Sequence, residues 1–453
     1  RLTSSAGAGQ VEARCGWLTV YEDRAAGRGR QIRLHVAVIP AVSRSPAPDP
    51  LFFIPGGPGE AASEAYLGLA DAFTRLNQKR DIVLVDQRGT GRSHPLDCGD
   101  DDTEDVSAND PADLQAAFQR CLQAQDADPR FYTTAIAMDD LDQVRQALGY
   151  QQINLYGASY GTRAALVYMR QHPGRVRSAI LDGVAPVGWP LGVDAPQDAQ
   201  RALEMLFERC AAQPECAKAF PDLPRKFDAL LERLDEQAPI ETALDHPISG
   251  LPTSTPVDRA RFTNLVHLMS YAPETAALLP LLIHDAYQRQ SFDRFAAISL
   301  STEGTLSSAI SVGMRMSVTC AEDLPLYQQA RVTEGYLGDY SVATFKDICQ
   351  VWPQGAIPDG YNQPVHSDAP VLLISGEADP VTPPENAAQA AETLPNSLQL
   401  VAPGMGHVNI NRGCISRLAA RFIEAGSPAG LDPACVANIA PLPFFVNFSG
   451  PTP

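Results

Sequence analysis

The most constraining feature of the sequence is a series of short, unbroken apolar runs separated by stretches with helical spacing. Apolar runs of strand length are typical of parallel strands that helices cover on both faces. Before the third run, Leu141, Val144 and Leu148 recur on one helical face. This alternation predicts an α/β fold with a mostly parallel central sheet. The runs are Leu51–Ile54, Ile82–Val85, Ile153–Tyr156, Ala179–Leu181, Val371–Ile374 and Leu398–Val401.

An earlier segment has a different period. Between residues 32 and 38, apolar side chains alternate with polar ones such as Arg33 and His35. A period of two with one wet face is typical of an antiparallel strand, so we expect this strand at an edge of the sheet.

The alternation of strands and helices stops between about residues 186 and 368. There the apolar positions recur only at helical spacing, as in Leu203, Leu206 and Phe207. A helical block inserted between two parallel strands lies over their carboxyl ends, where open α/β sheets bind ligands. We therefore expect a first core part at residues 1–185, an inserted all-helical cap at 186–368, and a second core part with a disulfide-linked tail at 369–453.

Charge and composition exclude several classes of partner. The net charge of −18 repels phosphate backbones and anionic lipid surfaces, so we expect no nucleic-acid partner. The longest apolar runs have strand length, so we also expect no membrane insertion. The sequence leaves the oligomeric state open.

Nine cysteines bear on the cellular compartment. They form no CxxC pair and no Cys/His cluster with zinc spacing, so no metal site is expected. Eight of them group by position into local pairs, one of about 105 connectivities that eight cysteines allow, and Cys15 is left over. The chain begins at Arg1 rather than Met, as a processed protein would. We expect a periplasmic or extracellular protein. The proposed pairs are Cys98 with Cys121, Cys210 with Cys216, Cys320 with Cys349, and Cys414 with Cys435.

A nucleophile motif follows the third apolar run. Gly157-Ala-Ser159-Tyr-Gly161 has the pattern G-x-S-x-G, and a helix-forming stretch comes directly after it. In this strand–turn–helix context the flanking glycines permit a tight turn, and the serine hydroxyl projects over the sheet. We therefore expect Ser159 to be a nucleophile.

A serine nucleophile needs a base and a carboxylate that orients the base, in the chain order serine, acid, histidine. Of the eight histidines, only His407 lies in a loop after a late core strand, and we expect it to be the base. The acid should follow the preceding strand, where Glu377 and Asp379 compete. We favour Asp379, because it lies deep in the turn before a proline.

The oxyanion formed during acyl transfer needs two backbone N–H donors. One is expected from Tyr160, the residue after the nucleophile. The other is expected from Gly57 in the loop Ile54-Pro-Gly-Gly-Pro-Gly59, since glycine lets the backbone approach a substrate carbonyl.

Several motifs together resemble the proline iminopeptidase branch of the α/β-hydrolases, and most of all its secreted bacterial relatives that include tripeptidyl aminopeptidases. Pro55 is a departure, because proline iminopeptidases usually carry a histidine there, and strict proline specificity is therefore in doubt. The resemblance spans most of the core and reaches the cap only locally. Its motifs are Gly56–Gly59, Asp86–Ser93, Thr134–Arg145, Gly157–Gly161, Gly376–Pro383, Gly404–His407 and the tail Cys414–Cys435.

The resemblance also implies how the substrate is held. Carboxylates of the cap would bind its free α-amino group, because a desolvated ammonium needs a charged partner. The matching carboxylates are Glu322 and, as second candidate, Asp323, held by a Cys320–Cys349 disulfide. We expect Asp86 and Arg88 to support the oxyanion loop by ion pairing.

These residues predict a secreted serine exopeptidase that releases N-terminal residues from peptides through an acyl-enzyme. Its substrate is a peptide or small molecule with a free amine, and no metal or organic cofactor is needed. Two alternatives stay open. One is a carboxylesterase or amidase that acts on small molecules, because the fold hosts both chemistries. The other is a catalytically inactive binding module on the same fold.

Overall fold

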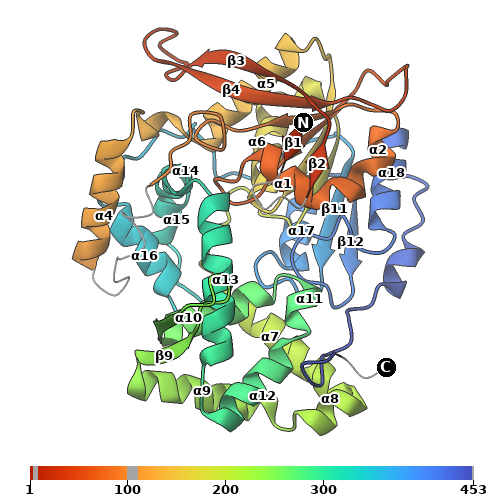
Figure 1. Cartoon of the computed structure of the whole chain (residues 1–453). Helices are drawn as coiled ribbons and strands as arrows, with labels where there is room; N and C mark the ends of the chain where they lie inside the picture. The colour runs from red at the N-terminus through yellow and green to blue at the C-terminus, as the bar shows by residue number, and fades with distance from the viewer. Residues whose placement is uncertain (4–8, 99–110, 451–453) are drawn as a thin grey trace.

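The computed structural model describes residues 1–3, 9–98 and 111–450 (Figure 1). At its centre is an eight-stranded sheet in the order β12-β11-β8-β7-β5-β6-β4-β3. Neighbours from β12 to β6 pair parallel, whereas β4 pairs antiparallel with both β6 and β3. The strands are β3 (Arg14–Tyr21), β4 (Gln31–Ile39), β5 (Leu51–Ile54), β6 (Ile82–Val85), β7 (Ile153–Ala158), β8 (Val176–Asp182), β11 (Val371–Gly376) and β12 (Ser397–Ala402).

All six apolar runs are parallel strands, as predicted. In β5, Phe52 and Ile54 enter one apolar cluster while Leu51 and Phe53 enter the other, so both faces of the strand are buried. The alternating segment is β4, which is antiparallel as predicted. Its expected place at the edge is wrong, because the mostly exposed strand β3 pairs outside it.

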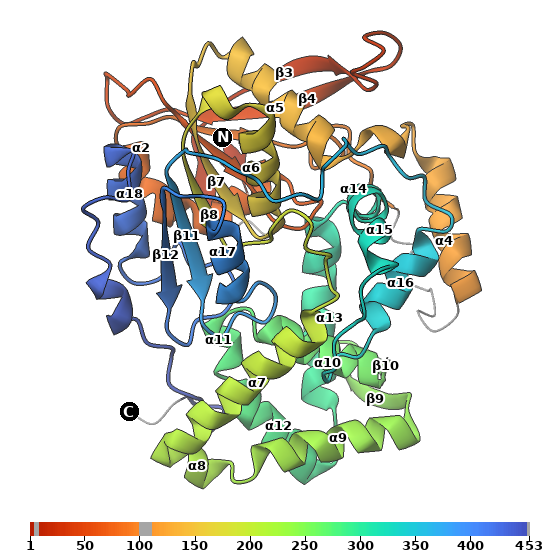
Figure 2. The same ribbon diagram turned by 180° about the vertical axis from the view of Figure 1, so that it is seen from behind.

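Helices cover both faces of the sheet, so the predicted α/β fold class is confirmed (Figure 2). One face carries α5 (Thr134–Ala147), α6 (Tyr160–Gln171) and α17 (Pro384–Ala391). The other face carries α1 (Ala62–Leu69), α2 (Thr74–Asn77) and α18 (Ile415–Ala425).

The chain between β8 and β11 forms a cap on the side to which the arrowheads of β11 and β12 point (Figure 2). Its residues 199–296 contribute to an apolar cluster that includes Leu203, Phe227 and Phe262, whereas its residues 312–352 contribute to a second one that includes Met316 and Phe345. The limits 185/186 and 368/369 stay a prediction. The helices are α7 (Ala195–Ala212), α8 (Pro214–Ala219), α9 (Leu223–Gln237), α10 (Arg259–Met269), α11 (Pro273–Ala276), α12 (Leu279–Arg289), α13 (Asp293–Ala309), α14 (Val312–Val318), the π-helical turn η4 (Thr319–Asp323), α15 (Leu324–Tyr327) and α16 (Tyr340–Ile348).

The expectation of an all-helical cap is wrong in one segment. Strands β9 (Ile240–Asp245) and β10 (Pro252–Val257) form an antiparallel hairpin between α9 and α10. Threonines and one valine at alternate positions of β10 favour a strand, and its two prolines exclude a helix interior. Apolar spacing alone missed this hairpin.

The helices in the described part of the chain are too short or too polar to span a membrane singly. Residues 259–269 and 273–289 reach the length and composition of a span only as a pair, which is bent by 119°.

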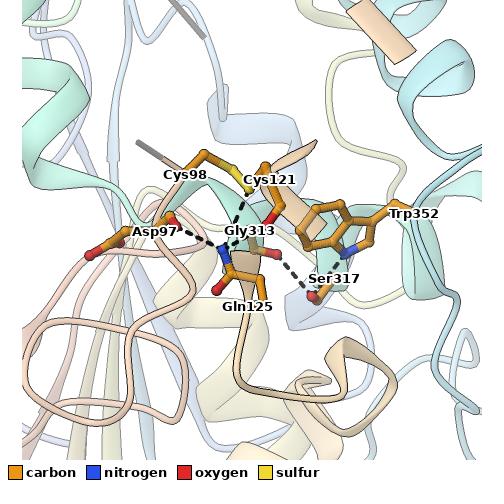
Figure 3. Close-up of a disulfide and its surroundings, with 7 residues drawn as sticks. All are labelled: Asp97, Cys98, Cys121, Gln125, Gly313, Ser317 and Trp352. Carbon is orange, nitrogen blue, oxygen red and sulfur yellow. Dashed lines mark hydrogen bonds between the residues drawn. A yellow bond between two sulfur atoms is a disulfide. The ribbon is translucent and has the colours of Figure 1, made fainter. Parts of the chain in front are cut away.

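The structure contains four disulfides with the predicted pairing, and Cys15 is an exposed free cysteine on β3. Cys98–Cys121 lies close to the junction of core and cap (Figure 3). Beside it, Gln125 Nε2 donates to the carbonyl oxygen of Asp97 at 2.8 Å. Disulfides stabilise mainly by restricting the unfolded chain.

A hydrogen bond also connects the cap to the core at this junction. The Gly313 N–H of α14 donates to the carbonyl oxygen of Leu96 at 2.8 Å. Trp352 Nε1 donates to Ser317 Oγ at 3.1 Å, and that hydroxyl donates to the Gly313 carbonyl (Figure 3). The C-terminal tail provides a second tie, because Phe445 N–H donates to Ala277 O at 3.1 Å.

The pairing predicts one reactive thiol in the unreduced protein. Thiol titration of the denatured chain without reductant should find Cys15 alone, and titration after reduction should find all nine cysteines. Peptide mapping without reductant should recover the four linked pairs. More than one free thiol before reduction would contradict the pairing.

Candidate active site

Ser159 lies in a strained turn between β7 and α6, with φ of 53° and ψ of −122°. The turn is held by a hydrogen bond from Ser159 N–H to the Asp182 carbonyl at 2.9 Å. A Cβ on Gly157 would lie 2.4 Å from the Gly161 oxygen, and one on Gly161 would lie 2.2 Å from the Ile54 oxygen. Both positions therefore require glycine, and the strain is the kind that clusters at functional sites.

The structure places Asp379, and not Glu377, against His407. His407 Nδ1 is 2.8 Å from Asp379 Oδ2, and both side chains are buried. Glu377 is exposed and accepts from Gly404 N–H at 2.8 Å instead. Because Nδ1 donates to the carboxylate, the neutral ring keeps Nε2 as its proton acceptor.

Thr382 completes the surroundings of the carboxylate. Its hydroxyl donates to Asp379 Oδ2 at 2.9 Å and lies 3.1 Å from His407 Nδ1. The N–H groups of Val381 and Thr382 donate to Asp379 Oδ1 at 2.8 and 2.9 Å. Sequence analysis missed Thr382, because nothing in the turn distinguishes its hydroxyl from an exposed one.

Electrostatics favour an ionised pair. Burial acts to raise the pKa of Asp379, but the charge of His407 and these hydrogen bonds outweigh burial and hold that pKa below its ordinary value. Burial acts to lower the pKa of His407, but Asp379, with smaller contributions from Asp182 and Glu60, raises it above its ordinary value. The imidazolium formed when His407 accepts a proton is therefore stabilised.

The loop that carries His407 is held from both sides. Asp182, at the end of β8, accepts from the N–H groups of Asn409 and Ile410, each at 2.8 Å. Burial raises the pKa of Asp182 to about 6. From the cap, the Tyr271 carbonyl accepts from His407 N–H at 2.7 Å. Asp182 directly follows an apolar run, at the sheet edge where Asp379 also lies, and this position in the sequence could have identified it.

The predicted oxyanion donors lie beside the nucleophile. A Cβ on Gly56 would lie 3.3 Å from Ser159 Cβ, so the loop after β5 packs against the elbow. Gly57 has φ of 103°, which favours glycine. Within the described residues, neither Gly57 N–H nor Tyr160 N–H donates to any acceptor. Both N–H groups stay the predicted oxyanion donors.

The expected support of this loop by ion pairs of Asp86 and Arg88 is wrong, because Asp86 lies against His35 Nδ1 and the start of α1. Asp86 accepts from Ser63 N–H at 2.8 Å and from its hydroxyl at 3.0 Å, at the start of α1. Arg88 instead pairs with Asp140 of α5 at 2.6 Å and donates to the Glu22 carbonyl at 2.8 Å. Arg88 therefore joins the β3–β4 turn to α5.

A carboxylate that sequence analysis missed follows the oxyanion loop. Glu60 is partly buried, and its Oε2 accepts from Gly56 N–H at 3.0 Å. A Cβ on Gly56 would lie 3.2 Å from this oxygen. The position of Glu60 directly after Gly-Gly-Pro-Gly was the available signal.

Glu322 and Asp323 are buried side by side in η4 and share Arg163. Glu322 accepts from Thr134 N–H at 2.7 Å, and its other oxygen accepts from the Thr134 and Tyr361 hydroxyls. Asp323 Oδ1 accepts from Arg163 Nη1 at 3.0 Å, whereas its Oδ2 is buried without a partner. A role of either residue in amine binding stays a prediction.

A mostly apolar pocket opens beside Ser159. Asp323 lies behind one part of its wall, because it bonds to Arg163 and to Leu191 N–H. The described residues place no group of three or more His, Cys, Asp or Glu side chains for a metal ion. The lining residues are Pro58, Ser159, Tyr160, Arg163, Ala185, Trp189, Leu191, Val381 and Thr382.

The His407–Asp379 pair predicts a pH profile. As pH falls, His407 is protonated and loses its function as a base, so kcat/KM should fall with an apparent pKa above the ordinary value of 6.5. Asp379→Asn removes the charge that raises this pKa. It should move the acid limb to lower pH and reduce kcat by ~10⁴-fold. An unchanged acid limb in the variant would contradict the pairing.

The glycine requirement at the elbow predicts a large effect of one methyl group. Gly161→Ala should lower the free energy of unfolding by about 1–3 kcal/mol, since the Cβ overlaps the Ile54 carbonyl. It should also lower kcat, because the turn that carries Ser159 must shift. Gly174→Ala is the control, since its Cβ meets nothing within 4 Å. Denaturant unfolding and steady-state kinetics measure both effects, and equal behaviour of the two variants would contradict the packing.

Comparisons with known proteins agree with this fold. The profile described as alpha/beta hydrolase fold matches residues 49–224, and the one described as TAP-like protein matches residues 335–435. The chain is 24% identical over 430 residues to serine protease Hip1 of Mycobacterium tuberculosis, covering 83% of this chain and 79% of that protein. It is 25% identical over 469 residues to tripeptidyl aminopeptidase of Streptomyces coelicolor, covering 95% and 84%.

A third relative matches a shorter stretch. Proline iminopeptidase of Neisseria gonorrhoeae is 32% identical over 144 residues, which cover 31% of this chain and 34% of that protein. The chain is therefore a serine hydrolase with the α/β-hydrolase fold, similar in sequence to tripeptidyl aminopeptidases and proline iminopeptidases.

Proposed function

We propose that this chain is an exopeptidase that releases N-terminal residues from peptides through an acyl-enzyme on Ser159. The observation that carries the proposal is the 2.8 Å hydrogen bond between His407 and Asp379 at the sheet edge where Ser159 lies. The peptidase names of the relatives support a peptide as substrate.

In the first half of the reaction, Ser159 attacks the carbonyl carbon of the substrate while His407 Nε2 takes its proton. Asp379 holds the ring in the required tautomer and stabilises the imidazolium. The N–H groups of Gly57 and Tyr160 donate to the oxyanion; loss of one such donor costs about 3–4 kcal/mol of transition-state stabilisation in serine proteases.

In the second half, His407 returns the proton to the leaving amine, and the ester of Ser159 remains. His407 then takes a proton from water, whose oxygen attacks the acyl carbon. When the second tetrahedral intermediate collapses, the bond from the acyl carbon to Ser159 Oγ breaks and His407 returns the proton to Oγ, which frees the acid and restores serine. The residues named here therefore complete the cycle without any further group.

Selection of a chain terminus rests on the cap and on negative charge near the site. The cap lies over the carboxyl ends of the strands (Figure 2), which restricts the site to short chain ends. Glu322 and Asp323 with one Arg163 leave one negative charge in excess when both are ionised, which favours a cationic α-amine. Both side chains are fully buried, so their charge would attract the amine across the pocket wall.

The compartment forms part of the proposal. Four disulfides support export to an oxidising compartment, since such bonds are rare in reducing cytosol. We therefore infer a periplasmic or extracellular location.

A small-molecule esterase is the second candidate. The pocket beside Ser159 is mostly apolar, with Pro58, Ala185, Trp189, Leu191 and Val381 in its wall. Such a lining also suits the acyl group of an ester, and the catalytic residues do not distinguish the two substrates.

A matched pair of fluorogenic amides separates the candidates. Alanine 7-amido-4-methylcoumarin with a free α-amine should be cleaved. Its N-acetyl form should be cleaved at least tenfold more slowly, because it lacks about one charge-assisted hydrogen bond to the enzyme. Ser159→Ala should abolish both activities. Equal cleavage of the two amides would contradict the aminopeptidase, and preference for a matched ester would favour the esterase.

A further inference from the structure

Glu60 is an acidic side chain beside the oxyanion loop, and it has no role in the proposed mechanism. Its Oε2 accepts from Gly56 N–H at 3.0 Å in the oxyanion loop. Its backbone bridges to Ile310 of the cap, so the residue lies where loop and cap meet. In the described residues, no Lys or Arg pairs with its carboxylate and no donor reaches Oε1.

The carboxylate lies close to the nucleophile. A Cβ on Gly56 would be 3.2 Å from Glu60 Oε2 and 3.3 Å from Ser159 Cβ, so these two atoms are no more than 6.5 Å apart. Glu60 is also close enough to His407 to raise the pKa of its imidazole. It therefore belongs to the immediate surroundings of the reacting atoms.

Bond lengths determine which substrate group can reach a carboxylate at this distance from Ser159 Cβ. In the residue that is attacked, the α-nitrogen is two bonds from the carbonyl carbon, about 2.5 Å. The carbonyl carbon approaches the serine oxygen to about 3–3.5 Å, and an ammonium–carboxylate hydrogen bond spans about 2.8 Å. A carboxylate that binds this nitrogen therefore lies several ångströms from the serine Cβ, as Glu60 does.

A longer acyl segment fits Glu60 less well. If three residues left together, the α-nitrogen would lie two residues farther along the chain, about 7 Å more when extended. That distance carries it beyond an oxygen within 6.5 Å of Ser159 Cβ. The position of Glu60 favours an ammonium on the attacked residue itself.

The cap carboxylates differ from Glu60 in their partners. Both oxygens of Glu322 accept hydrogen bonds, and Asp323 pairs with Arg163. Glu60 accepts one backbone N–H, and among the described residues no Lys or Arg forms an ion pair with it. Glu60 is partly buried, and burial raises the pKa of its carboxyl group. A substrate ammonium within hydrogen-bond distance would stabilise the ionised carboxylate.

We propose that Glu60 binds the α-ammonium of the residue whose carbonyl Ser159 attacks, and that the enzyme therefore releases one residue per cut. This inference rests on the proposed aminopeptidase function. It assigns to the core loop, rather than to Glu322 or Asp323, the contact that determines how many residues leave.

Glu60→Gln tests the charge and preserves the shape. The amide oxygen of glutamine can still accept from Gly56 N–H, so the oxyanion loop keeps its hydrogen bond. For alanine 7-amido-4-methylcoumarin, kcat/KM should fall by about 10- to 150-fold, the range for a lost charged hydrogen bond, mostly through KM. The propionyl amide, which lacks the amine, should be unaffected. Glu64→Gln, an exposed carboxylate on α1, is the matched control and should match wild type on both substrates.

The outcomes separate this inference from the proposed function. If wild type prefers the free amine and Glu60→Gln keeps that preference, Glu60 is not the amine partner. If Glu60→Gln slows both amides equally, Glu60 only supports the loop and the inference is wrong. If wild type shows no preference for the free amine, the aminopeptidase proposal itself fails.

A second readout does not depend on folding of the variant. Wild type acting on Ala-Ala-Ala 7-amido-4-methylcoumarin should release alanine first, with a lag before fluorescence. Immediate fluorescence together with intact trialanine would overturn release of one residue per cut.

Glu60→Asp keeps the charge and should recover part of the free-amine preference that Glu60→Gln loses. No recovery in a folded Glu60→Asp would count against the charge as the cause.

Discussion

The site depends on one close backbone approach, where the start of α6 crosses the carboxyl end of β5. A Cβ on Gly161 would lie 2.2 Å from the Ile54 oxygen and 2.5 Å from the Pro55 oxygen, so the helix can lie there only with glycine. This approach places Ser159 against the loop that follows β5. The nucleophile, Gly57 N–H and Tyr160 N–H are consequently neighbours, fixed by packing of the backbone. Such rigid placement of donors is the usual source of oxyanion stabilisation in enzymes.

The remaining groups reach this point because parallel strands end at the same edge. Asp379 follows β11, His407 follows β12, and Asp182 ends β8 and holds the histidine loop through Asn409 and Ile410. The cap takes part directly, because the Tyr271 carbonyl accepts from His407 N–H. This hydrogen bond joins the cap to the catalytic histidine. A change in cap packing would therefore affect the position of His407 as well as substrate access.

Sequence predicted those parts of the site that depend on local pattern. Gly157-Ala-Ser159-Tyr-Gly161 after an apolar run requires the elbow, and the loops after the last two strands contain few choices of acid and base. The groups it missed act across the fold. Glu60 is notable only because the fold places it near Ser159. Arg88 was named but given the wrong partner, because Asp140 is distant along the chain. The hairpin β9–β10 was missed because helical spacing on either side of it dominated the interpretation.

The central claim is that Ser159 is a nucleophile activated by His407 and Asp379, and active-site labelling tests it without a known substrate. A fluorophosphonate should add one adduct per chain, peptide mapping should place the adduct on Ser159, and His407→Ala should slow its formation strongly. Absence of an adduct on the folded wild-type protein, or an adduct on another residue, would contradict the account.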